Sequence, residues 1–221
     1  LQDAEALARA FGSFGLHPGD VISFQLPNWV EACVINLAAS LGGYVINPIV
    51  PIYRDAEVLQ MLCDSASKAF FVAERFRNTD YAAMVDRLRP NLPALQHVIY
   101  VRSNERAPNY ADLIELGRSL RQDLPNVDAR QVKLLLYTSG TTGRPKGVLH
   151  SHNSLDRVAQ TSFRHSGVGG VDVTLMPSPV THISGYSGGL EKPFAVGSRT
   201  VLMESWNGAN VAGCAHSWIY F

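Results

Sequence analysis

Hydroxyl groups, glycines and a single lysine are concentrated in one short stretch, "TSGTTGRPKG" at residues 138–147. Glycine allows close backbone approach to a ligand, and successive free amide groups in such a loop form a concavity that binds anions. Lys146 adds one compact positive charge, which suits a phosphate group. The stretch therefore predicts a loop that binds a polyphosphate. The residues expected to contact it are Thr138, Ser139, Gly140, Thr141, Thr142, Gly143 and Lys146.

The stretch differs from the common P-loop of nucleotide-binding proteins. That motif places Ser or Thr after its lysine and continues into a helix. Here Pro145 precedes the lysine, and Gly147 with an apolar, strand-like segment follows it. Phosphate binding by a helix N-terminus is therefore not expected at this loop. The alternative is a polar hairpin tip without a ligand, because Ser, Thr and Gly are common in turns.

The string "YTSGTTGRPKGV" at 137–148 resembles the phosphate-binding signature of adenylate-forming enzymes. These include acyl-CoA synthetases, luciferases and the adenylation domains of peptide synthetases. The resemblance extends to "GLHPGDVISFQLPNW" before the signature and "MPSPVTHISGY" after it, and covers about residues 9 to 205. The residues from Pro177 to Tyr186 resemble acyl-CoA synthetases for fatty and cyclic carboxylic acids.

The resemblance implies a fragment of an ATP-dependent carboxylate–CoA ligase. Such an enzyme joins a small carboxylic acid to AMP with release of pyrophosphate, and the thiol of CoA then displaces AMP. ATP, Mg²⁺ and CoA are therefore the expected cofactors of the complete enzyme. Hydrogen-bond donors and Mg²⁺ at the phosphate oxygens would stabilise the developing charge. The alternative is a nucleotide-binding or self-associating module without catalytic activity.

His182 is expected to be the second catalytic residue beside Lys146. The resemblance places this histidine between the nucleotide and the acyl pocket, where it would orient the carboxylate. The alternatives are a core histidine bonded to backbone and a turn residue. Ser184, Gly185 and Tyr186 are candidates for the pocket lining, although ordinary packing explains them equally well.

The two nearby histidines His150 and His152 could in principle bind a metal. No Cys, Asp or Glu accompanies them at a spacing typical of metal ligands. We expect them instead to precede and begin a helix, with Ser151 or Asn153 as the cap. No metal ligand is predicted in the chain.

Composition excludes several classes of protein. The 221-residue chain has 19 Lys and Arg and 19 Asp and Glu, without blocks of like charge. A nucleic-acid partner is therefore not expected. Cys33, Cys63 and Cys214 form no CxxC pair, which favours a reducing, cytoplasmic location. No signal peptide is recognised, and Glu31 and Asn36 argue against a membrane span in the apolar stretch 29–46.

Apolar strand-like segments alternate with amphipathic helical segments along the chain, which predicts an α/β fold with a mostly parallel sheet. The segment 132–138 is too apolar for an exposed face, so we expect it inside the sheet. Residues 1–206 are expected to be part of a large N-terminal AMP-binding domain, and the small C-terminal domain of such enzymes is absent. Residues 207–221 do not fit the family, and a frame or cloning artefact would explain this tail. An incomplete sheet would expose an edge that favours homo-oligomers.

Overall fold

The main sheet of the computed structural model has six strands, and the described residues are 1–103, 105–138, 145–167 and 169–204. The spatial order is β6-β3-β1-β2-β7-β8. Five strands run parallel, and β8 pairs antiparallel with β7. The predicted α/β class with a mostly parallel sheet is confirmed. The strands are β1 (Val21–Gln25), β2 (Val45–Pro48), β3 (Ala69–Ala73), β6 (His97–Val101), β7 (Val132–Thr138) and β8 (Lys146–Ser151).

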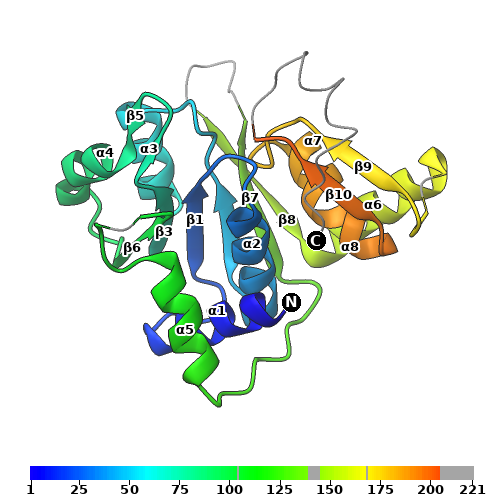
Figure 1. Cartoon of the computed structure of the whole chain (residues 1–221), viewed down its shortest axis with the longest axis horizontal. Helices are drawn as coiled ribbons and strands as arrows, with labels where there is room; N and C mark the ends of the chain where they lie inside the picture. The colour runs from blue at the N-terminus through cyan, green and yellow to red at the C-terminus, as the bar shows by residue number, and fades with distance from the viewer. Residues whose placement is uncertain (104, 139–144, 168, 205–221) are drawn as a thin grey trace.

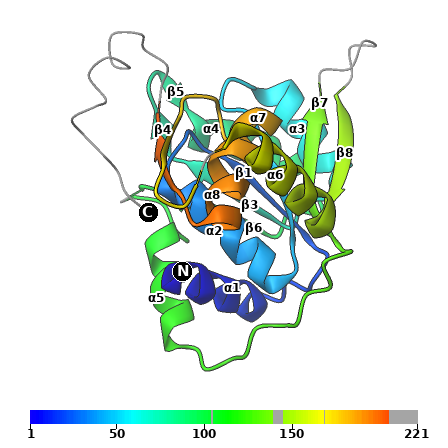
Figure 2. The ribbon, with the colours of Figure 1, turned by 90° about the vertical axis from the view of Figure 1, so that its right-hand side faces the viewer.

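Helices cover both faces of this sheet. Three helices, α1 (Gln2–Ser13), α2 (Val30–Gly42) and α5 (Tyr110–Ser119), pack together on one face. The other face carries α3 (Asp55–Asp64) and α4 (Tyr81–Leu88), as Figures 1 and 2 show. Because β-α-β crossovers are right-handed, helices lie on opposite faces when the chain moves in opposite directions along the sheet. The chain moves from β1 to β2 in one direction and from β2 past β1 to β3 in the other, so α2 and α3 lie on opposite faces. The short connecting elements are β4 (Arg75–Phe76), β5 (Thr79–Asp80) and the 3₁₀ turn η1 (Arg89–Asn91).

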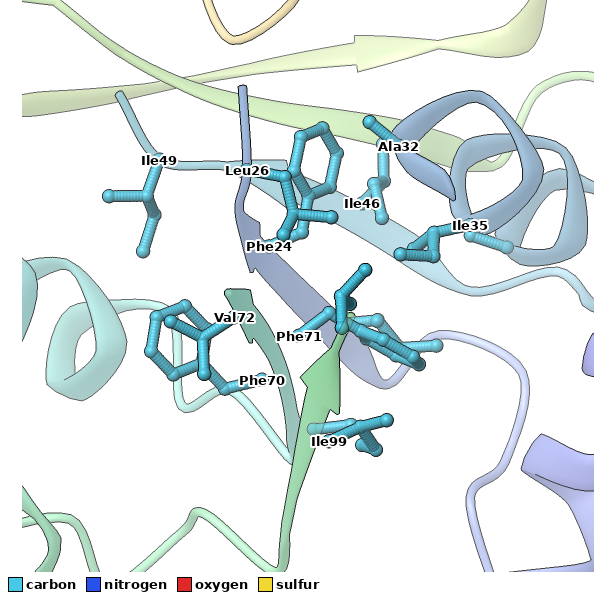
Figure 3. Close-up of a cluster of buried hydrophobic side chains, with 14 of the residues drawn as sticks. Phe24, Leu26, Ala32, Ile35, Ile46, Ile49, Phe70, Phe71, Val72 and Ile99 are labelled. Carbon is cyan, nitrogen blue, oxygen red and sulfur yellow. The ribbon is translucent and has the colours of Figure 1, made fainter. Parts of the chain in front are cut away.

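The main core lies between the sheet and these helices. Phe24 of β1, Ile46 of β2 and Phe71 of β3 are fully buried, and Figure 3 shows them within one apolar cluster. Each such side chain contributes roughly 1.5–3 kcal/mol by leaving water. Because both faces are covered, strands such as "AFFVA" are apolar at every position rather than at alternate positions.

A second, smaller lobe follows β8. It contains the parallel pair β9 (Val173–Met176) and β10 (Arg199–Leu202), which forms its own sheet. Figure 1 shows the helices of this lobe beside that pair. The alternation of strand-like and helical segments predicted elements of both kinds along the chain, but not a second sheet separate from the main one. The helices are α6 (His152–Ser166), α7 (Ile183–Gly185), the π-helix η2 (Tyr186–Glu191) and α8 (Lys192–Val196).

The apolar stretch 29–46, in which no membrane span is expected, consists of α2 followed by β2. Glycine ends this helix, because Gly43 has a φ of 74° that other residues adopt at a cost. Within the described ranges, no helix is long and apolar enough to cross a membrane.

Candidate functional site

The predicted phosphate-binding stretch begins and ends on the hairpin of β7 and β8. Thr138 is the last residue of β7 and pairs with Lys146, the first residue of β8. The Thr138 hydroxyl lies 3.5 Å from the Lys146 carbonyl oxygen. Both residues are exposed, and no carboxylate of the described chain lies within salt-bridge distance of Lys146. The remaining predicted contacts, Ser139, Gly140, Thr141, Thr142 and Gly143, lie outside the described residues.

The segment after β8 begins a helix, as predicted. α6 starts at His152, and the Ser151 hydroxyl accepts a hydrogen bond from the Ser154 amide at 3.2 Å. Ser151 is therefore the cap, rather than Asn153. Nε2 of His152 is buried without a hydrogen-bond partner in the described chain. Burial and the nearby Lys133 lower the pKa of this imidazole.

Metal-ligating side chains do not cluster in the part of the chain that the structure describes. It contains no group of three His, Cys, Asp or Glu residues that could hold a metal ion. His150 and His152 therefore have no third ligand there.

His182 lies at the start of α7 in the second lobe. Its Nδ1 lies 2.9 Å from the Ser184 hydroxyl and accepts a hydrogen bond from the Ser184 amide. Both side chains are exposed, so His182 is a helix cap rather than a core histidine. Figures 1 and 2 place α7 at the same end of the main sheet as the carboxyl end of β7.

The next two predicted pocket residues are buried. A Cβ atom on Gly185 would lie 2.0 Å from the carbonyl oxygen of Pro179, so no larger residue fits there. Tyr186 is fully buried, and its hydroxyl donates to Oδ1 of Asn36 at 2.6 Å. Burial raises the pKa of this phenol well above its ordinary value. Both contacts agree with packing, and a pocket role for Ser184, Gly185 and Tyr186 stays a prediction.

A cleft of about 370 Å³ lies where the two lobes meet. Its walls come from the segments that follow β1, β2, β9 and β10 and from the region of the β4–β5 hairpin. Ligands of open α/β sheets bind at the carboxyl ends of parallel strands, which is where these segments begin. The lining residues are Pro27, Asn28, Val50, Pro51, Ile52, Arg54, Phe76, Arg77, Thr79, Tyr81, Pro177, Pro179, Met203 and Glu204.

Two guanidinium groups, of Arg54 and Arg77, and one carboxylate, of Glu204, leave the cleft with a net positive charge. Arg54 donates to the carbonyl oxygen of Pro51 at 2.8 Å and to the Thr79 hydroxyl at 3.0 Å. The Arg77 guanidinium lies 5.3 Å from the centre of the Phe76 ring. Neither guanidinium forms a salt bridge with a carboxylate among the described residues, although that of Arg54 is already bonded to neutral oxygens.

The cleft residues were not predicted from the sequence. Arg54 lies soon after the carboxyl end of β2, and Arg77 lies soon after the carboxyl end of β3 and directly after β4. The ends of neighbouring parallel strands would have been a usable signal. The signature loop indicates a binding site at the end of β7 only, not at the ends of the other strands.

The chain matches the family described as "AMP-binding enzyme" over residues 1–217. It is 32% identical to the medium-chain fatty-acid–CoA ligase of Escherichia coli K12 over 204 residues, covering 91% of the chain and 36% of that relative. It is 28% identical to the acetyl-coenzyme A synthetase of Salmonella typhimurium, covering 92% of the chain and 33% of the relative. The chain thus spans about a third of the length of these relatives.

Solved structures have the same fold. The N-terminal domain of FACL13 from Mycobacterium tuberculosis matches with a TM-score of 0.82 and 26% identity, over 96% of this chain and 51% of that one. The anthranilate CoA ligase AuaEII, solved with anthranoyl-AMP, matches with a TM-score of 0.84 and 22% identity, over 97% of this chain and 40% of that one. With the match over residues 1–217, these findings show that the chain belongs to the family of AMP-binding enzymes.

Proposed function

We propose that this chain is part of an enzyme that activates a carboxylic acid with ATP and transfers the acyl group to CoA. The match to AMP-binding enzymes over residues 1–217 carries this proposal. The names of two relatives, a medium-chain fatty-acid–CoA ligase and an acetyl-coenzyme A synthetase, support acid–thiol ligation. The resemblance of residues 177–186 favours a fatty or cyclic acid as the substrate.

Thr138 and Lys146 are proposed to bind the β- and γ-phosphates of ATP. The exposed ammonium group of Lys146 has no carboxylate partner in the described chain, so a phosphate can approach it without breaking an ion pair. A lysine acts on phosphate as a point charge and tolerates several geometries. Ser139, Gly140, Thr141, Thr142 and Gly143 would complete the binding loop.

At this site Mg²⁺ would bind to phosphate oxygens of ATP rather than to a set of protein carboxylates. The described chain has no acidic cluster for it, and Mg²⁺ commonly binds through substrate phosphates and one or two carboxylates. When bound, the ion would neutralise charge on the departing pyrophosphate. His182, exposed at the start of α7, is proposed to orient the carboxylate of the acid.

The arginine-lined cleft is proposed to receive a charged part of the acceptor CoA. CoA carries several phosphate groups, and Arg54 and Arg77 provide two cations without carboxylate partners in the described chain. The apolar walls suit an uncharged chain beside those phosphates. Residues 1–206 are proposed to be part of the larger, N-terminal domain, and residues 207–221 lie outside the described residues.

The test is ATP–pyrophosphate exchange by the complete protein with a panel of fatty and cyclic acids. Exchange that depends on one acid is the expected result. Lys146→Ala should lower the exchange rate by about 10²-fold or more, because removing one preorganised donor at a charged transition state typically has that effect. Arg130→Ala, which removes an exposed charge paired with Asp128, is the matched control and should retain the wild-type rate. Absence of exchange with every acid would contradict the proposal.

A second candidate is a nucleotide-binding or self-associating module without catalysis. The edge strand β8 favours it, because Leu149 is 62% exposed and Val148 is 40% exposed on a strand that pairs on one side only among the described strands. Exposed apolar edges promote pairing between chains. The exchange assay separates the candidates, since such a module would bind ATP without forming pyrophosphate.

A further inference from the structure

Tyr137 joins the β7–β8 hairpin to the helix α3. Its hydroxyl donates to Oδ2 of Asp64 at 2.6 Å, and it lies 3.4 Å from the Met61 carbonyl oxygen. Both acceptors belong to the last turns of α3, more than 70 residues earlier in the chain. Burial, followed by the bond to Asp64, raises the pKa of the phenol, so Tyr137 remains a hydrogen-bond donor at neutral pH.

The ring of Tyr137 also lies against β8. Tyr137 pairs with Gly147, next to the pair of Thr138 with Lys146. A Cβ atom on Gly147 would lie 2.7 Å from Leu135 Cδ1 and 3.5 Å from Cε1 of the Tyr137 ring. The Tyr137 ring therefore lies within van der Waals range of the β8 backbone one residue from Lys146, and Leu135 is the neighbour that a larger residue at 147 would displace.

The start of β8 has few other contacts to hold it. β8 is the edge strand and pairs only with β7 among the described strands. Residues 146–149 are all exposed, so burial does not fix them. Tyr137 is the residue of β7 that links this end of the hairpin to the body of the protein through a side-chain hydrogen bond to another element.

We propose that Tyr137 is a positioning residue: through its bond to Asp64 and its contact with Gly147, it fixes the place of Lys146 relative to the sheet. The proposal rests on the proposed role of Lys146 in binding phosphate. Tyr137 itself is not expected to touch the nucleotide. Its hydroxyl is directed toward α3.

The test compares Tyr137→Phe with the wild-type protein in two measurements. The first is the affinity for MgATP by calorimetry, which should weaken by up to roughly tenfold, because the free energy of one hydrogen bond to a charged group is the most that ordering of Lys146 can lose. The second is amide hydrogen exchange, which should become faster at residues 146–148 and stay unchanged in α2. Asp64→Asn, which keeps an oxygen acceptor for the phenol, should retain more of the affinity than Asp64→Ala.

Tyr44→Phe is the matched control. Tyr44 is buried, whereas Tyr137 is partly buried, and the Tyr44 hydroxyl likewise bonds to another segment, the Leu16 carbonyl oxygen, at the opposite end of β2 from the cleft. An equal loss of affinity in Tyr44→Phe would indicate general destabilisation and would overturn the proposal. Unchanged exchange at 146–148 in Tyr137→Phe would overturn it as well. If the wild-type protein does not bind MgATP, the proposed function fails, and hydrogen exchange alone still decides whether Tyr137 positions Lys146.

Discussion

The ion pair between Lys133 and Glu191 is the most buried charged contact of the described chain. Nζ of Lys133 lies 2.8 Å from both carboxylate oxygens of Glu191, and each side chain is 11% exposed. The pair joins β7, which leads to Thr138, to the π-helix that follows His182. Asn36 of α2 completes the cluster through its bond to Tyr186 and a longer contact of 3.4 Å with Glu191.

Lys133→Met should destabilise the protein by about 3–5 kcal/mol, because it leaves the Glu191 carboxylate buried without a counterion. The double variant Lys133→Met with Glu191→Met should be close to wild type, since it removes both charges. Urea unfolding of the three proteins measures this difference. The exposed pair Arg130–Asp128 is the control, and Arg130→Met should cost less than about 1 kcal/mol. A double variant as unstable as the single one would show that the unpaired Glu191 carboxylate is not what destabilises the single variant.

The positions of some single residues could be predicted from the neighbouring sequence, whereas the contacts of others could not. Lys146 and Thr138 lie at the ends of two paired strands, as a loop between apolar segments predicts. The contacts of Tyr186 with Asn36 and of Asn28 with the second lobe join residues about 150 positions apart. Such contacts depend on how the lobes pack, and local sequence patterns do not contain that information.

At the scale of elements, strands buried on both faces were the easiest to predict. Segments such as 69–73 and 132–138 are apolar over most of their length, and they form β3 and β7. The two-residue strands β4 and β5 were missed because they are too short for a periodic pattern. The separate sheet of β9 and β10 was missed because strand pairing depends on distant segments rather than on strand composition.

The close contact between α1 and α5 gives a testable prediction at the scale of elements. Gly117 of α5 lies so close to α1 that an added Cβ atom would be 1.8 Å from the Ala6 carbonyl oxygen. Gly117→Ala should therefore push the two helices apart and cost about 1–3 kcal/mol or more, the range for overpacked sites. Gly12→Ala is the matched control, because its Cβ would meet only the Gln122 side chain at 3.5 Å. It should stabilise α1 by up to about 1 kcal/mol. Thermal unfolding should show melting temperatures that shift in opposite directions.

At the scale of the whole molecule, Asn28 links the main sheet to the second lobe. Its side-chain nitrogen donates to the carbonyl oxygens of Ser178 at 2.9 Å and Met203 at 3.0 Å. Its oxygen accepts from the Val180 amide at 2.8 Å. The residue is 8% exposed and lines the cleft, so it bonds to the ends of β9 and β10 where the proposed acceptor site lies.

Asn28→Ala should leave these three backbone groups without their partner and loosen the second lobe relative to the sheet. Hydrogen exchange should become faster at Val180 and around Met203, while the amides of β1 and β3 keep their protection, because each buried group left unsatisfied costs about 1–3 kcal/mol. Asn28→Asp separates the two roles of the side chain. Its carboxylate can still accept from the Val180 amide but faces the carbonyl oxygens of Ser178 and Met203, so exchange should become faster around Met203 while the Val180 amide keeps its partner. If hydrogen exchange at Val180 and around Met203 stayed at the wild-type rate in both variants, the lobes would be held mainly by apolar packing rather than by this amide.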